Sequence, residues 1–332
     1  MNASKSVQDV QFKPRRIGHG NFFVSDLERS MAYYEHVFGL QVVFREPGIG
    51  AGFLSNGNSH HDVGLIEIPK KTLIGRDGQV QVPVKEERKP GLNHIGLEME
   101  SEAHLVAAYE RAMAAGAPVH RTVDHTIAYS VYMFDPDGYY LEFYADSQDD
   151  WRAIMEEKSE QLLTGDWTPD PAVASDVPKY VVETERRTVE GAPLQPHRAA
   201  RASLFVRDLA TSIDFYADIV GLTLVAGSAA DGYAVFAGTV GSWDLGLFQV
   251  GEDATTPRMH HFGFELSSPI ELETVMERLR AAGARVEGQI VHATKQSVCV
   301  RDPDGILFEF YFQQSRDAAA LQNPPKDPAF LV

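Results

Sequence analysis

The chain repeats itself, and this duplication constrains its fold more than any single motif does. A shift of 182 residues places Val24-Ser25-Asp26-Leu27 on Val206-Arg207-Asp208-Leu209, and a shift of 167 residues places Asp135-Pro136-Asp137-Gly138 on Asp302-Pro303-Asp304-Gly305. Because the second shift is shorter, the first half must carry an insertion, which we place at about residues 70–90. A repeat of this length indicates that one structural unit has been duplicated.

Each half divides again into two modules with one common pattern. An apolar strand comes first, then an amphipathic helix such as Leu27–Val37 or His104–Ala115, and then alternating segments typical of β-strands. In the later modules an Asp-Pro-Asp-Gly turn precedes the aromatic strands Tyr139–Tyr144 and Ile306–Phe312. The pattern predicts an α+β protein with four βαβββ modules paired into two domains.

We therefore divide the chain into three parts. Residues 1–147 form an amino-terminal domain, and residues 197–332 form a carboxy-terminal domain whose tail from Asp317 onward is expected to be a peripheral strap. Between them, residues 148–196 begin as a helix that runs through Leu163 and continue as a proline-rich, extended linker.

Composition excludes several classes of protein. The net charge of −17 would repel the phosphates of a nucleic acid. Cys299 is the only cysteine, so an intramolecular disulfide and a thiolate metal cluster are both excluded. The sequence contains neither a signal peptide nor an apolar run long enough to span a membrane. We expect a cytoplasmic homo-oligomer that acts on a small molecule.

The paired modules resemble those of the vicinal oxygen chelate superfamily, which form a cup around a metal ion. In that superfamily the ligands come from the opening strand of one module and from the opening and closing strands of its partner. The residues at these positions are His19, His94 and Glu142, and the resemblance implies that residues 1–147 hold the metal. Two imidazoles and one carboxylate leave open coordination positions, as non-haem Fe(II) requires, and such ligands also suit Mn(II) or Zn(II).

A longer segment resembles the signature of extradiol ring-cleaving dioxygenases over its full length. It comprises Val123-Asp124-His125, Val131-Tyr132, Asp135-Pro136-Asp137-Gly138 and Glu142. The resemblance implies an Fe(II) enzyme that cleaves a catechol-type aromatic diol with O₂. In such an enzyme His125 and Tyr132 would donate hydrogen bonds to oxygen atoms of the substrate or of an intermediate.

A second, shorter segment, His61-Asp62-Val63-Gly64-Leu65, is similar to the one that presents the acid–base histidine of these dioxygenases. His61 would then exchange protons with the substrate. Its neighbour His60 is expected to face away, because successive side chains of a strand alternate. Three further histidines are assigned to solvated surface: His36, His104 and His120.

The second half does not repeat this set of residues. His261, Glu309 and His292 are retained, whereas three positions have changed: Arg201 replaces His19, Trp243 replaces His61 and Cys299 replaces Tyr132. A permanently protonated guanidinium cannot bind a metal, so we expect that the second half holds no metal. It would instead be a scaffold that shields the first half or mediates oligomerisation. A pairing of the first module with the fourth, which would join His19 to His261 and Glu309, stays open.

Two other functions remain as alternatives. A metal-dependent isomerase or lyase of the glyoxalase or epimerase type would need a second glutamate, and the candidate is Glu67, six residues beyond His61 on the same strand face. A non-catalytic protein that binds aromatic ligands would need no metal ligands, and this alternative fits the second half better than the first. The substituents on the substrate's ring are not predicted.

Overall fold

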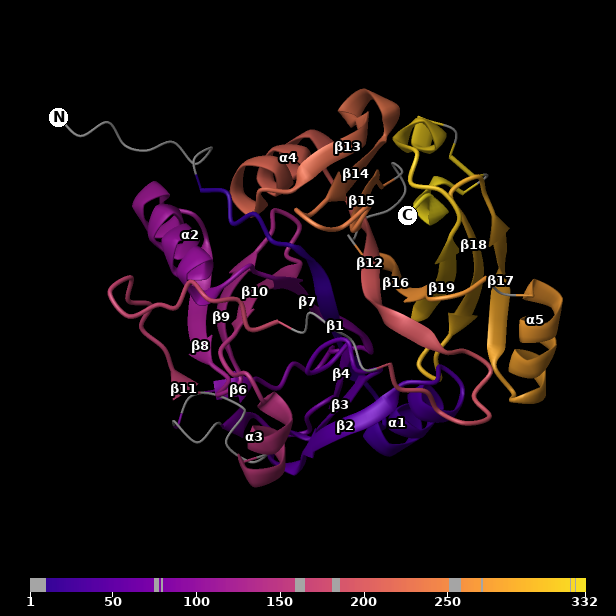
Figure 1. Cartoon of the computed structure of the whole chain (residues 1–332), viewed down its shortest axis with the longest axis horizontal. Helices are drawn as coiled ribbons and strands as arrows, with labels where there is room; N and C mark the ends of the chain where they lie inside the picture. The colour runs from indigo at the N-terminus through magenta and orange to yellow at the C-terminus, as the bar shows by residue number, and fades with distance from the viewer. Residues whose placement is uncertain are drawn as a thin grey trace.

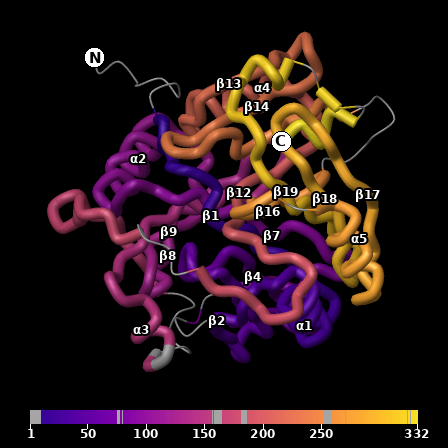
Figure 2. Tube along the Cα trace, turned by 45° about the vertical axis from the view of Figure 1, so that its right-hand side comes forward, coloured from indigo at the N-terminus to yellow at the C-terminus, as the bar shows by residue number. Residues whose placement is uncertain are grey.

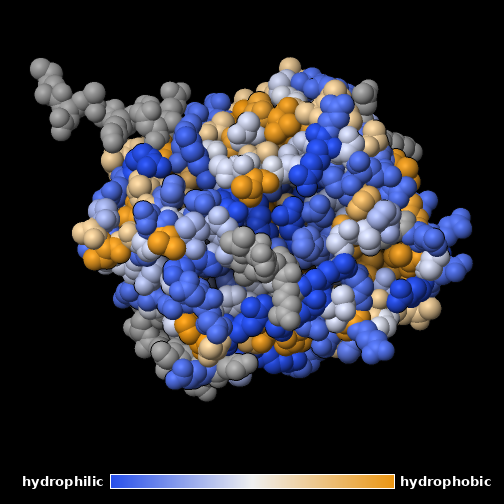
Figure 3. Space-filling model, in the orientation of Figure 1, coloured by the Kyte–Doolittle hydropathy of each residue, from blue (hydrophilic) through white to orange (hydrophobic). Residues whose placement is uncertain are grey.

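Two large sheets, one in each half of the chain, organise the molecule in the computed structural model (Figure 1). The structure describes residues 10–74, 78, 80–158, 165–180, 186–250, 258–269, 271–322, 324–325 and 327–332. Within these residues, no helix is long and apolar enough to cross a membrane. The face of the molecule in Figure 3 is mostly hydrophilic, with small and scattered hydrophobic patches.

The first sheet has nine strands and contains the first two modules. Strands β1 and β7 open the two modules and pair antiparallel at its centre, and β10 and β4 lie parallel to β7 and β1 on the outer sides. The order across the sheet is β11 (Gly165–Asp166), β8 (Val119–Asp124), β9 (Ala128–Phe134), β10 (Tyr140–Asp146), β7 (Gly91–Glu98), β1 (Arg16–Val24), β4 (Val63–Glu67), β3 (Ala51–Ser55) and β2 (Gln41–Glu46).

The second sheet repeats this order with eight strands, since β12 and β16 pair antiparallel at its centre. Its strands are β13 (Thr223–Ser228), β14 (Tyr233–Ala237), β15 (Leu245–Gln249), β12 (Pro196–Val206), β16 (Met259–Leu266), β19 (Leu307–Gln313), β18 (Lys295–Arg301) and β17 (Arg285–Val291). The prediction of four βαβββ modules paired into two sheets is therefore confirmed. The pairing of β1 with β7 shows that module one joins module two, so the alternative pairing with module four is wrong.

The helices begin and end where local signals place them. The module helices are α1 (Leu27–His36), α2 (Glu102–Ala115), α4 (Leu209–Asp214), which continues as the π-helix η4 (Phe215–Val220), and α5 (Leu272–Ala281). Side chains of Asp26, Ser101 and Asp208 cap the first three helices by accepting a hydrogen bond from the backbone three residues later. Helix α2 ends at Gly116, whose φ of 71° is left-handed and therefore suits glycine.

The insertion and the linker lie against the first sheet. Within residues 70–90 the structure has a small hairpin, β5 (Leu73–Ile74) with β6 (Val80–Val82). After the sheet, α3 (Trp151–Lys158) packs Trp151 and Met155 against Ile127. The predicted helix ran on through Leu163, but residues 159–164 lie outside the described part of the chain.

The two halves face each other with approximate twofold symmetry. The Asp-Pro-Asp-Gly turn of the second module receives a hydrogen bond from Tyr216 to Asp135 (3.0 Å), and that of the fourth module receives the equivalent bond from Tyr34 to Asp302 (3.1 Å). Phenylalanines from both halves, including Phe22 and Phe262, fill one continuous core between the sheets. The turns predicted from sequence therefore also join the two halves.

The tail is not the peripheral strap that we expected. Short 3₁₀-helices η6 (Ala318–Gln322) and η7 (Pro328–Phe330) lie against the second sheet, as the yellow segment in Figure 2 shows. Leu321, Leu331 and Val332 are fully buried, and the ring of Phe330 stacks on His261. The described apolar residues of the tail pack in one cluster with Tyr233, Trp243 and Phe248 of the second half.

Candidate metal centre and its cavity

Three neighbouring strands bring His19, His94 and Glu142 together. In the register of the first sheet, both His19 on β1 and Glu142 on β10 lie opposite Gly96 of the central strand β7. Each histidine directs Nε2 at Glu142 Oε2, at 2.8 Å from His19 and 3.0 Å from His94. A Cβ atom on Gly96 would lie within 2.5 Å of the His19 ring, so glycine is required there. These three residues can hold a metal ion.

A comparison of the two halves tests whether this site fits a cation. Glu142 and Glu309 occupy equivalent positions, both are buried, and each accepts a hydrogen bond from an equivalent serine, Ser130 at 2.6 Å and Ser297 at 2.5 Å. Glu309 is neutralised by the ammonium of Lys295, 2.7 Å away, and the equivalent of Lys295 in the first half is Ala128. A buried carboxylate needs a positive partner, and a cation held by His19, His94 and Glu142 would supply in the first half the charge that Lys295 supplies in the second.

The electrostatics of the ligands agree with this interpretation. Burial alone would raise the pKa of Glu142, but the hydrogen bonds from His19 and His94 outweigh it and hold this pKa well below its usual value. Burial also lowers the pKa of His94, which keeps the imidazole neutral. An ionised carboxylate with neutral imidazoles is the protonation state that metal binding requires.

His61 lies beside these ligands, as the sequence predicts. Its ring centroid is 4.1 Å from that of His19, and its Nε2 is buried without a hydrogen-bond partner among the described residues. Burial, followed by the nearby His19, lowers the pKa of His61 well below the usual value. The neutral ring can therefore accept a proton.

His60 does not face away from the site, contrary to the expectation from strand alternation. It is buried, its Nδ1 lies 3.2 Å from Nδ1 of His61, and its Nε2 lies 3.5 Å from Asp146 at the end of β10. Both histidines lie in the loop before β4, where the alternation of a strand does not apply. No sequence pattern predicted the contact of His60 with Asp146.

His125 and Tyr132 also come together at the cavity. His125 lies in the tight turn between β8 and β9, where Thr126 adopts a left-handed φ of 69°, and its Nε2 lies 3.0 Å from the Tyr132 hydroxyl. Burial, and then the charge of Glu142, raises the pKa of Tyr132 well above its usual value. The hydroxyl therefore keeps its proton and can donate a hydrogen bond.

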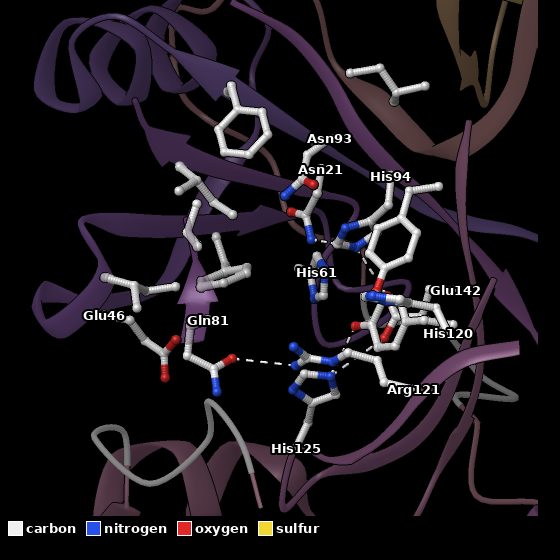
Figure 4. A pocket seen from close by; sticks show the side chains of 18 of the residues that line it. Asn21, Glu46, His61, Gln81, Asn93, His94, His120, Arg121, His125 and Glu142 are labelled. Carbon is white, nitrogen blue, oxygen red and sulfur yellow. Dashed lines mark hydrogen bonds and ion pairs between the residues drawn. The ribbon is translucent and has the colours of Figure 1, made fainter. Parts of the chain in front are cut away.

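A cavity of about 640 Å³ opens in front of the ligands and is shown in Figure 4. His94, Glu142, His61, His125 and Tyr132 all line it, while His19 lies buried behind them. The apolar and aromatic part of the remaining wall comes from several elements: Phe23, Phe44, Ile49, Phe53, Ile66, Phe134 and Tyr140.

Several polar lining residues were not predicted. His120, assigned to solvated surface from sequence, lines the cavity and has its Nδ1 2.8 Å from the hydroxyl of Tyr140. Asn21 places its Nδ2 2.7 Å from Nε2 of His94. The shared strand face of His19, Asn21 and Phe23 was the available signal for Asn21, whereas Arg88 and Arg121 reach the cavity from a loop and an outer strand.

The residues retained in the second half form a different cluster. His261 Nε2 lies 3.3 Å from Glu309 and 3.1 Å from the backbone oxygen of Val332, and Arg201 stacks on the ring of Tyr311 at 3.9 Å. Other equivalents of first-half residues have ordinary structural contacts: Cys299 is buried, Trp243 packs in the core with the tail, and Nδ1 of His292 lies 2.8 Å from Thr294. The potential metal-ligand group that contains His19 includes neither His261 nor Glu309 in the described part of the chain.

Glu67, the residue on which the isomerase alternative rests, does not join the ligands. Its carboxylate accepts a hydrogen bond of 3.1 Å from the backbone of Leu27 at the start of α1. The strand periodicity that placed Glu67 near the cup does not hold, because His61 precedes β4 rather than lying within it. The group of potential metal ligands found in the described part of the chain is His19, His94 and Glu142.

Comparisons with known proteins agree with this architecture. The family model of the Glyoxalase/Bleomycin resistance protein/Dioxygenase superfamily matches residues 16–143 and 198–310, and the chain belongs to that superfamily. The catechol-2,3-dioxygenase of Bacillus subtilis (strain 168) is 26% identical over 298 residues, which cover 86% of this chain and 93% of the relative.

Solved structures show the same fold at low identity. Homoprotocatechuate 2,3-dioxygenase from Arthrobacter globiformis superimposes with a TM-score of 0.64 and 17% identity, covering 96% of this chain and 87% of that structure. A Mn(II)-bound glyoxalase from Novosphingobium aromaticivorans superimposes with a TM-score of 0.63 and 16% identity, covering 91% of this chain and 83% of that structure. Ring-cleaving enzymes and a glyoxalase thus share the fold. The fold alone therefore does not indicate which of these reactions a protein catalyses.

Proposed function

We propose that the protein is an Fe(II)-dependent extradiol dioxygenase that cleaves the ring of a catechol-type aromatic with O₂. One observation carries the proposal: the buried set His19, His94 and Glu142 meets a cavity lined by His61, His125 and Tyr132. The curated relative with 26% identity is a catechol-2,3-dioxygenase, which supports the same class of reaction. A cytoplasmic location and a homo-oligomeric state stay predictions.

In this proposal His19, His94 and Glu142 hold the metal, with Fe(II) preferred and Mn(II) the alternative. Bound there, the ion would supply a template for the diol and O₂, as an open two-histidine, one-carboxylate site does. The aromatic walls of the cavity would exclude water and hold the ring in place.

The remaining residues would handle protons and oxygen atoms. The neutral imidazole of His61, with Nε2 free of protein partners in the described residues, would accept the proton of a substrate hydroxyl and later return it. Tyr132 would donate a hydrogen bond from its hydroxyl to a substrate oxygen, and His125, 3.0 Å away, would orient that hydroxyl.

The two alternatives lose support. An isomerase or lyase needs a further carboxylate ligand, and Glu67 is bonded to the start of α1 instead. A binding protein without catalysis would not require a buried carboxylate beside two imidazoles with no lysine to neutralise it. In the second half the tail packs with Trp243 and contacts His261, so it occupies space that a free aromatic ligand would need there.

An oxygen electrode with metal analysis tests the proposal. The iron-loaded, reduced protein should consume about one O₂ per catechol without an added reductant, and air-free samples should regain activity when air is admitted. His94→Ala should lose metal and activity together, whereas the matched His261→Ala in the other half should keep about one metal per chain. Turnover that proceeds equally well without oxygen would assign the protein to the isomerase class instead.

A further inference from the structure

Two arginines stand in the cavity without a carboxylate partner. Arg121 on β8 and Arg88 in the insertion both line the space in front of the metal ligands, and both are half-buried. Neither forms an ion pair with an acidic side chain among the described residues, although the chain carries 47 acidic residues against 30 basic ones. In so acidic a protein, two unpaired guanidinium groups in one partly apolar cavity call for an explanation.

Each guanidinium is held in place by a protein hydrogen bond but keeps further N–H donors. Arg121 donates from Nη2 to Oε1 of Gln81 at 3.3 Å, as Figure 4 shows, and Arg88 donates from Nη2 to the backbone oxygen of Pro83 at 3.0 Å. The Arg88 group also lies over the ring of Phe23, 4.0 Å from its centre. A guanidinium offers five N–H donors in a planar fork that matches a carboxylate. One hydrogen bond each to the described residues leaves further N–H donors for a ligand.

The other charges of the cavity do not need these arginines. Glu142 is bonded to His19, His94 and Ser130, and Glu46 lines the cavity without an ion pair to either arginine. If the diol of a substrate is directed to the metal ligands, its ring substituent extends into the rest of the space. A cavity of about 640 Å³ falls in the range of roughly 300–1,000 Å³ that accommodates ligands larger than one small ring.

We propose that the substrate is a catechol carrying an anionic side group, such as a carboxylate, which Arg121 and Arg88 bind. This inference rests on the proposed function and adds the substrate class to it. Arg88, Gln81 and Lys85 all belong to residues 70–90, the insertion that the second half lacks. The insertion would therefore be the segment that adapts a duplicated cup to a charged substrate.

A pair of probes tests the inference. 3,4-Dihydroxyphenylacetate and 4-methylcatechol carry the same diol, and only the first has a carboxylate. The wild-type protein should prefer the anionic compound by about tenfold or more in kcat/KM, and by a similar factor in Kd when binding is measured by calorimetry without oxygen. Arg121→Gln and Arg88→Gln should each reduce this preference by about tenfold, the usual scale of a charged hydrogen bond, mainly through KM and Kd.

Arg45→Gln is the matched control. Arg45 lies on β2 between the lining residues Phe44 and Glu46, but it is exposed and pairs with Glu28, so its loss should leave the preference unchanged. Equal or better use of the neutral catechol by the wild-type protein, or an unchanged preference in both arginine variants, overturns the inference and leaves the dioxygenase proposal standing. If no catechol is oxidised at all, the proposed function fails, and the anaerobic calorimetry still decides whether the cavity selects an anion.

Discussion

One position separates the two buried glutamates of this chain. Glu142 has Ala128 beside it and Glu309 has Lys295, yet both carboxylates lie on equivalent strands with an equivalent serine bond. Lys295 therefore supplies beside Glu309 a positive charge that no side chain at position 128 supplies beside Glu142. The sequence indicated this only indirectly, through Arg201 in place of His19, because the reach of Lys295 to Glu309 depends on the pairing of β18 with β19.

His61 is the residue whose replacement should separate metal binding from turnover. His61→Phe keeps a ring of similar shape beside His19 but removes the atom that can accept a proton, so metal content should stay near wild type. Turnover of a catechol should fall about 10²-fold or more, the usual scale of general acid–base assistance. Metal analysis and oxygen uptake on the same sample measure both. Turnover within a few-fold of wild type would remove His61 from the mechanism.

His260 provides a prediction about pH. Burial, and then His261, lowers its pKa to about 3, below the value of about 6.5 expected in the unfolded chain. Between these values the unfolded chain binds a proton that the folded protein does not, so the free energy of unfolding falls as the pH falls through this window.

Replacement of His260 should remove this contribution to the pH dependence. Urea unfolding at pH 7 and at pH 5 measures how far the free energy of unfolding falls between the two pH values. This fall should be roughly 2 kcal/mol smaller in His260→Asn than in the wild type. Metal release at low pH affects both proteins and cancels in the difference. An equal loss in the two proteins would mean that His260 is already charged when folded.

At the scale of elements, the Asp-Pro-Asp-Gly turns have two tasks. Asp135 accepts hydrogen bonds from the backbone of Asp137 and Tyr139, which shapes the turn between β9 and β10. It also accepts the hydroxyl bond of Tyr216 from the other half. Because β9 and β10 carry Tyr132 and Glu142, the second half helps to hold the hairpin of the candidate site.

Loss of either tyrosine hydroxyl tests this connection. Tyr216→Phe and Tyr34→Phe should each lower the free energy of unfolding by about 1 kcal/mol, since each leaves a buried aspartate with one bond fewer. Only Tyr216→Phe should also raise the KM for a catechol, because only Asp135 lies in the hairpin with Tyr132. Thermal unfolding and steady-state kinetics measure the two effects. An equal change of KM in both variants would contradict a specific role for the turn of the second module.

The elements themselves were largely predictable, and the contacts between distant elements were not. Periodicity and the duplication predicted the modules and the helices, and the resemblance to the vicinal oxygen chelate superfamily implied the grouping of His19, His94 and Glu142. His120 and Arg121 were missed as cavity residues because their strand β8 lies next to the edge of the sheet, three strands away from β7, and the sequence pattern does not show that such a strand lines the cavity. The burial of Leu331 and Val332 was missed because a short apolar segment at a chain end carries no periodic signal.

At the scale of the whole molecule, the ligand positions of the first half can be compared with the equivalent positions of the second half. Arg201→His combined with Lys295→Ala would give the second half the ligands of the first, and metal content should rise from about one toward about two ions per chain. Single Lys295→Ala should instead destabilise the protein, because Glu309 would stay buried with no ammonium beside it. A folded double variant with unchanged metal content would mean that the tail, which touches His261 at Val332, also prevents binding.

The pseudo-twofold contact gives the molecule the organisation of a dimer whose subunits are covalently tethered. Backbone bonds cross it in both directions, from Lys13 to Val220 and from Leu194 to Val37, as in an isologous interface between identical subunits. Residues 148–196 tether the halves, and a tether converts their association into an intramolecular step. Dilution therefore cannot separate the halves, and one of them is free to lose its own chemistry while it continues to support the other.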